Sequence, residues 1–181
     1  IRNIIGSWLG YGVPNYTKVL GCTEQRISII GFGQLVDGEA HLFTLPLPPS
    51  LAAKRIRRRL TVTLAYLTQI ASSTQKYRVA NLWFDLDGDV DLASNRKDAD
   101  HNTVKRGTVQ HEIFEDEKAI PINDGDTVII KVNCRKDAQR IKEPVPYGLI
   151  VSLEVAEAVE LPIYDEVRVR MMPAIGIRPS N

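Results

Sequence analysis

Alternation of apolar and polar residues is the feature of this sequence that most limits its fold. In residues 60–66, apolar side chains occupy every second position. Because the side chains of a β-strand point alternately to its two faces, such a segment has one apolar and one polar face. Further strand-like runs of this kind cover residues 26–30, 41–47, 77–85, 108–114, 126–134 and 147–155. The sequence therefore predicts about seven or eight strands.

One-sided burial is typical of antiparallel sheets. The predicted strands are separated by turn residues, of which Asp124-Gly125 is the strongest signal, and Gly31 and Gly33 are expected to break the first strand. Many such strands favour an all-β fold, which we predict to be an antiparallel β-sandwich, jelly-roll-like in its connections. Its inward faces are predicted to carry Leu60, Val62 and Leu64; Val128, Ile130 and Val132; and Leu149, Val151 and Leu153.

Three parts of the chain differ in character. Residues 1–21 combine a glycine-rich loop with a short helix that starts at Pro14 and ends before Gly21. Residues 22–160 carry the predicted strands and a long polar loop over 87–107, with a helical turn near 100–105. Residues 161–181 form a short tail that is partly basic. We therefore predict a β-sandwich domain over 22–160 between an N-terminal border segment and a C-terminal tail.

Charge and hydropathy exclude several classes of protein. The chain has 181 residues, with 23 Lys and Arg against 22 Asp and Glu, so its net charge is +1. Because basic and acidic residues nearly balance, the net charge gives no global electrostatic reason to expect a nucleic-acid partner. No apolar run approaches the roughly 18 residues of a membrane-spanning helix, so we expect no membrane partner. With 44% hydrophobic residues, the chain has the composition of a globular domain.

An acidic run is the first candidate for chemistry. Asp85, Asp87, Asp89 and Asp91 place four carboxylates at every second position. Calcium takes several oxygen ligands from a flexible loop, so a calcium site is one interpretation. An EF-hand loop that starts at Asp85 would need Gly at its sixth position and Glu at its twelfth, and neither residue stands there. The interpretation that this count favours is a solvated acidic turn at the end of a strand.

A basic run over 54–59 has five Lys and Arg among six residues. Such a run suits phosphate binding, but no aromatic residue interleaves with it. We favour a solvated approach to the following strand, facing an acidic partner domain. The histidines, His41, His101 and His111, lack the close spacing of a zinc site, and no Gly-x-Ser-x-Gly motif marks a serine nucleophile. We predict no catalytic residue and no cofactor for this chain.

Two cysteines, Cys22 and Cys134, lie far apart in the sequence, each beside a strand-like run. We interpret them as two reduced, buried thiols; a single disulfide is the alternative. Sparse cysteine and the absence of a visible signal sequence favour a cytoplasmic location. Because the chain starts at Ile1 rather than Met, we expect it to be a piece of a longer protein.

Several short sequences, taken in order, carry a resemblance to one protein family. Residues 10–15, GYGVPN, with the short helix after them, resemble the end of the catalytic domain of subtilisin-like serine proteases. Later sequences are similar to the C-terminal extension of a bacterial subgroup of that family. They are 22–26 CTEQR, 37–41 DGEAH, 46–51 PLPPSL, 59–65 RLTVTLA, 106–112 RGTVQHE and 145–149 VPYGL. The resemblance covers nearly the whole chain.

The resemblance implies that the whole protein is a serine endopeptidase with an Asp-His-Ser triad. None of the triad motifs, Asp-Ser/Thr-Gly, His-Gly-Thr and Gly-Thr-Ser, occurs in this chain, so the chain itself is expected to have no enzymatic activity. It would be a non-catalytic accessory domain, with the short N-terminal helix left over from the catalytic domain. An autonomous module that binds carbohydrate or a protein is the alternative.

The partners that follow from the resemblance are the catalytic domain of the same protein and its protein substrates. The border segment 1–21 would supply the interdomain contact, through Trp8, Tyr11, Gly12, Val13 and Pro14. In the isolated chain its apolar side chains would lack the catalytic domain as a packing partner, and exposed apolar patches tend to bind other surfaces. We therefore expect this segment to pack on its own sandwich or to form a dimer.

Overall fold

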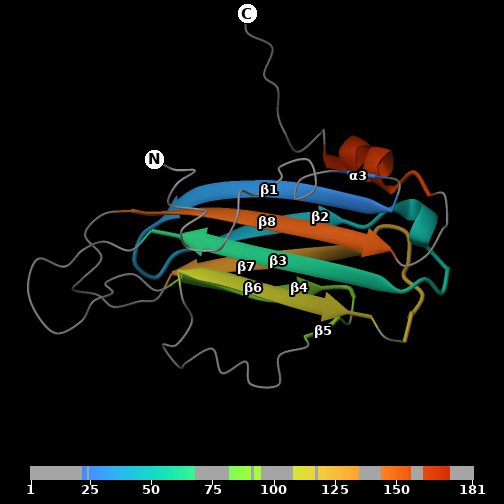
Figure 1. Ribbon diagram of the computed structural model, residues 1–181, viewed down its shortest axis with the longest axis horizontal. Coiled ribbons are helices and arrows are strands. Elements are labelled where there is room, and N and C mark those ends of the chain that lie inside the picture. The colour runs from blue at the N-terminus through green and yellow to red at the C-terminus, as the bar shows by residue number, and fades with distance from the viewer. Residues whose placement is uncertain are drawn as a thin grey trace, which may run out of the picture.

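The computed structural model describes residues 22–23, 25–67, 82–90, 92–94, 108–116, 118–134, 144–155 and 161–171. These residues form two antiparallel β-sheets, a 3-10 helix and an α-helix (Figure 1). No helix in these ranges is long and apolar enough to cross a membrane. The predicted helix over 14–20 and the predicted turn near 100–105 lie outside them.

The larger sheet has five strands in the order β1-β8-β3-β6-β5, and the smaller sheet has three in the order β2-β7-β4. Every neighbouring pair is antiparallel, and the smaller sheet lies behind the larger one in Figure 1. The strands are β1 (Arg26–Leu35), β2 (Ala40–Pro46), β3 (Arg58–Tyr66), β4 (Leu82–Gly88), β5 (Ala93–Ser94), β6 (Val109–Glu115), β7 (Thr127–Cys134) and β8 (Val145–Val155). The predicted all-β antiparallel fold is confirmed.

The chain crosses repeatedly between the two sheets, from β1 to β2, from β3 to β4 and from β6 to β7. A jelly roll has eight strands in two sheets that are built from Greek keys. Here β5 is only two residues long, and it pairs with β6 at the edge of the larger sheet. The jelly-roll-like connection therefore stays a prediction.

Both sheets bury their apolar faces in one shared core. The nine residues that the sequence places on inward faces all belong to it, and none is more than 5% exposed. Full burial of an aliphatic side chain contributes about 1.5–3 kcal/mol, so these strands supply much of the stability of the domain. Because a slip of one residue would turn each strand over, the agreement confirms the predicted facing of β3, β7 and β8.

β1 continues through Gly31 and Gly33, where the sequence predicts a break. Both glycines face the core. A Cβ atom at Gly31 would lie 2.7 Å from the Phe43 ring, and one at Gly33 would lie 2.8 Å from the Tyr147 hydroxyl. These glycines therefore make room for aromatic side chains inside the sandwich, and neither ends the strand.

The helix α3 (Ile163–Met171) packs at one end of the sandwich, close to the start of β1 (Figure 1). Ile163 and Val167, one turn apart on the same face, are fully buried in the common core. Glu166 accepts a hydrogen bond from the backbone N–H of Ser50, in the 3-10 helix η1 (Pro49–Leu51), at 3.1 Å. The described part of the predicted tail, 161–171, is thus packed into the domain.

Candidate functional site

Two of the acidic residues, Asp85 and Asp87, lie on β4. The Asp85 carboxylate accepts hydrogen bonds from the Asn133 side chain at 2.8 Å and from the Trp83 indole at 3.3 Å. Asp85 therefore ties β4 to β7 across the smaller sheet. Asp87 is exposed and accepts a hydrogen bond from the next backbone N–H at 2.8 Å. Both carboxylates have partners in the local structure.

Asp89 stabilises a turn instead. Its Oδ2 atom accepts hydrogen bonds from the backbone N–H of Thr127 at 2.8 Å and from the Thr127 hydroxyl at 3.1 Å. Asp91 lies outside the described residues. Within the described ranges, no three His, Cys, Asp or Glu side chains are grouped closely enough to hold a metal ion. The acidic run therefore fixes a strand and a turn, and the calcium site stays a prediction.

The basic run is not a uniformly solvated face. Arg58 is 3% exposed, and its guanidinium pairs with the Asp116 carboxylate. Arg59, the next residue, points outward and pairs with Glu115 at 2.8 Å. The prediction of a solvated approach is wrong for Arg58, because the alternation that buries Leu60 also buries the side chain two positions earlier.

The histidines make separate contacts. His41 on β2 shares a hydrogen bond with the Tyr147 hydroxyl, with 2.7 Å between Nδ1 and the oxygen. His111 on β6 is exposed on the outer side of the larger sheet and contacts the Thr63 hydroxyl at 2.8 Å. Burial raises the pKa of Tyr147 above its ordinary value of 10.0. His101 lies outside the described residues. The two described histidines, His41 and His111, contact different partners and do not form a common site.

No disulfide joins Cys22 to Cys134 in the structure. Cys134 lies buried on β7, and burial, reinforced by the nearby charges of Asp37 and Glu39, raises the pKa of its thiol from 9.0 to about 11. Because the thiolate is the reactive form of cysteine, Cys134 is a poor nucleophile at neutral pH.

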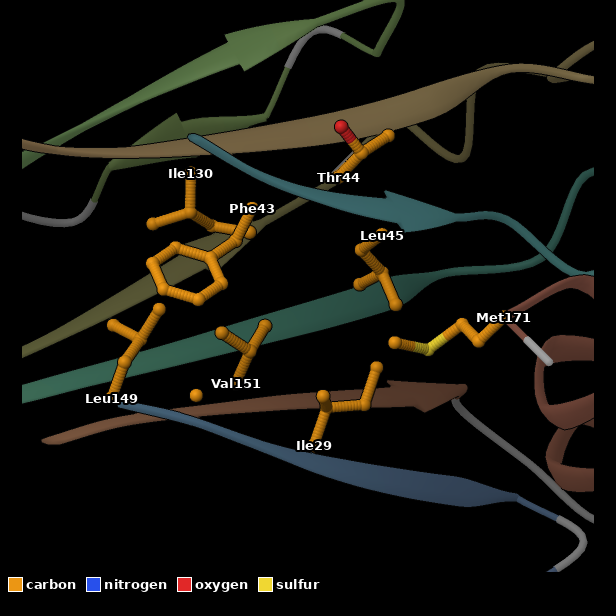
Figure 2. Close-up of a pocket in the computed structure, with 9 residues that line it drawn as sticks. Ile29, Phe43, Thr44, Leu45, Ile130, Leu149, Val151 and Met171 are labelled. Carbon is orange, nitrogen blue, oxygen red and sulfur yellow. The ribbon is translucent and has the colours of Figure 1, made fainter. Parts of the chain in front are cut away.

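A cavity of about 70 Å³ lies between the two sheets, and its walls are almost entirely apolar. In Figure 2, Phe43 and Ile130 of the smaller sheet face Leu149 and Val151 of the larger sheet, and Met171 of α3 stands at one end. Small-molecule sites usually measure about 300–1,000 Å³ and carry several polar groups. This cavity is therefore a packing defect with room for a small apolar group.

The outer face of the larger sheet carries a row of two exposed apolar side chains with two small residues between them. Strand pairing places Phe32, Gly148, Ala65 and Val109 in one row across β1, β8, β3 and β6. Phe32 is 81% exposed and Val109 is 64% exposed, whereas the two residues between them are small. Leu67, which directly follows β3, adds a third exposed apolar side chain. We call the row of four residues the trough.

Among the described residues of the same face, the charged ones lie at its other end. There, pairing sets Arg26, Glu154, Arg59 and Glu115 in one row, with the signs of charge alternating. Arg26 lies 3.3 Å from Glu154 and Arg59 lies 2.8 Å from Glu115. The charges at that end of the face therefore neutralise one another in pairs, and the trough itself carries no charged residue.

The sequence analysis missed the trough, because each of its residues looks ordinary on its own strand. A signal was present in β1, where Ile30 and Phe32 fall on the outward positions. Trp8, Tyr11, Gly12, Val13 and Pro14, the predicted interdomain contacts, lie outside the described residues.

No family model, no curated protein and no solved structure matches this chain. The geometry defines a class: a β-sandwich domain with an exposed apolar sheet face.

Proposed function

We propose that this chain is the non-catalytic C-terminal β-domain of a subtilisin-like serine endopeptidase. In this role it stabilises the protease or assists recognition of substrates and partners. The observation that carries the proposal is the trough, with Phe32 exposed beside Gly148 and Val109 exposed beside Ala65. A contiguous apolar face on a folded domain favours contact with another protein surface.

The described side chains favour a binding domain over an enzyme. An active site usually combines a sizeable pocket with convergent titratable groups. The cavity between the sheets holds about 70 Å³ and is apolar. The carboxylates of Asp85 and Asp89 accept hydrogen bonds from their own sheet and turn, and His41 bonds to Tyr147. These groups act in the local structure and do not converge on a common centre.

The resemblance to the C-terminal extension of these proteases also supports a binding role for the trough. Three of the similar sequences, 59–65, 106–112 and 145–149, include Ala65, Val109 and Gly148 respectively. The sequences that carry the resemblance thus overlap three of the four strands that form the trough.

The test is to read the coding sequence upstream of Ile1 and to assay this chain alone. We expect the three triad motifs upstream, and no cleavage of casein by the 181-residue chain. Removal of residues 22–181 from the complete protease should shorten its half-life at elevated temperature. An upstream reading frame without triad motifs, or casein cleavage by the chain alone that a serine-directed inhibitor blocks, overturns the proposal.

The alternative is an autonomous module that binds carbohydrate or a protein. The exposed Phe32 ring favours some binding role for the face. A carbohydrate platform usually has several exposed aromatic side chains, and among the residues described on this face Phe32 is the one Phe, Tyr or Trp. The face is therefore better suited to a protein partner than to a sugar.

A further inference from the structure

Gly148 is a glycine that the fold does not require. It lies inside β8, it is not among the positive-φ glycines, and a Cβ atom added there would meet no atom of the described residues within 4 Å. Gly33, its near neighbour on β1, differs, because a Cβ atom there would approach the Tyr147 hydroxyl to 2.8 Å. Glycine weakens a strand interior, and often marks a place where another backbone or a ligand approaches closely.

The open space at Gly148 is the floor of the trough. Phe32 and Val109 stand three strand spacings apart, which is about 14 Å at about 4.8 Å per spacing. Between them, Gly148 and Ala65 leave a strip with almost no side-chain height. The trough therefore has room for one row of side chains from another segment. An aromatic ring can lie over Gly148 and Ala65, because neither residue has a side chain larger than a methyl group.

The segment that precedes β1 joins the sheet at the edge formed by β1, next to the trough. The Cys22 thiol accepts a hydrogen bond from the backbone N–H of Ser28 at 3.4 Å. The N–H and C=O of one residue in an antiparallel strand point to the same side, so Cys22 lies at the edge of β1 away from β8. Phe32 is four residues along β1 from this point, which is about 13 Å. The preceding 21 residues are long enough to reach the trough.

Residues 1–21 also match the trough in chemistry. They include no acidic side chain, and Arg2 and Lys18 are their two charged ones. The trough is uncharged, and the charges at the far end of the face pair with each other. We propose that residues 1–21 pack across the trough of their own chain, with the Trp8 ring against Gly148.

This inference deepens the proposed function, since it names the surface on which the border of the protease unit rests. It can fail independently, because its test uses this chain alone and does not depend on what lies upstream.

The experiment follows the fluorescence of Trp8 in the full chain. The chain has two tryptophans, so Trp83→Phe leaves Trp8 as the sole reporter. We expect blue-shifted emission that acrylamide quenches poorly. Gly148→Val in this background should shift the emission to that of free tryptophan and restore quenching, while the far-UV circular dichroism of the sandwich stays unchanged, because the described residues leave space for a side chain at Gly148. Thr61→Val, two outward positions away on β3, is the control and should change neither signal.

Three results overturn the inference. One is emission of free tryptophan in the Trp83→Phe chain, and another is a protected Trp8 that Gly148→Val does not release. The third is protection that appears only at concentrations where sedimentation detects a dimer, since a second copy then covers the face. If Gly148→Val changes the far-UV circular dichroism, Gly148→Ala repeats the test with a smaller side chain.

Discussion

The guanidinium of Arg58 pairs with the carboxylate of Asp116 inside the domain, and each side chain is only 2% exposed. The backbone N–H of Asp116 also donates to the carbonyl of Arg58 at 3.0 Å. The two residues thus join the start of β3 to the chain that leaves β6. A buried ion pair adds little to stability compared with a well-packed apolar pair, but removal of one partner leaves an uncompensated charge in the interior.

We expect Asp116→Ala to lower the free energy of unfolding by about 3–5 kcal/mol. The reason is that Arg58 already has two buried donors, Nε and Nη1, without a hydrogen-bond partner in the described part of the chain. Urea denaturation measures the loss. Glu115→Ala, in the more exposed pair with Arg59, is the control and should cost about 0–1 kcal/mol. Equal losses for the two variants would contradict the assigned burial.

The inward glycines give a second prediction. Gly33→Ala should destabilise the domain by about 1–3 kcal/mol, because the added methyl group forces the Tyr147 hydroxyl and the His41 ring apart. Gly148→Ala is the matched change on the adjacent strand, and it should cost less than Gly33→Ala, because its methyl group meets no atom of the described residues within 4 Å. Calorimetry of both variants decides the point, and the opposite order of melting temperatures would show that β1 has been assigned the wrong facing.

The contrast between β3 and α3 shows what the sequence could predict. The alternation in 60–66 is local, so it predicted the strand and its buried face. In α3, Val167 and Val169 alternate with Arg168 and Arg170, which is also a strand-like pattern. Acidic residues in the first turn and basic residues in the last turn favour a helix. Arg170 also donates to the Leu47 carbonyl at 3.1 Å, a contact that no local pattern contains.

The buried charge and the trough required information from far along the chain. Asp116 lies 58 residues from Arg58, so local alternation marked Arg58 as inward-facing without offering its partner. The trough depends on the register of Phe32, Gly148 and Val109, which comes from three separate strand pairings. Long-range pairing of this kind is what single-strand patterns leave undetermined.

The cavity between the sheets predicts a stabilising substitution. Val151 lines the cavity, so Val151→Ile should place one more methylene group in it and raise the free energy of unfolding by about 0.8 kcal/mol. Val62→Ile is the control. Val62 pairs directly with Val151 and is fully buried, but does not line the cavity, so the same enlargement should overpack the core and cost about 1–3 kcal/mol. Destabilisation by Val151→Ile would mean that the neighbouring side chains already fill this space.

The Cys134 thiol predicts how stability falls at high pH. Its pKa rises from 9.0 to about 11 in the folded domain, so the folded state holds this proton more tightly than the unfolded state. Stability rises with pH where the unfolded state binds more protons, and here the folded state binds more. The contribution is therefore complete below pH 9 and is lost as the pH rises toward about 11. Cys134→Ala should flatten the fall of the melting temperature between these pH values.

The Tyr147 hydroxyl also contributes to the fall, because burial raises its pKa as well. It acts with the same sign from about pH 10 upward and keeps a residual slope in the Cys134→Ala variant. An unchanged slope in Cys134→Ala would show that the Cys134 thiol has the same pKa in the folded and unfolded states.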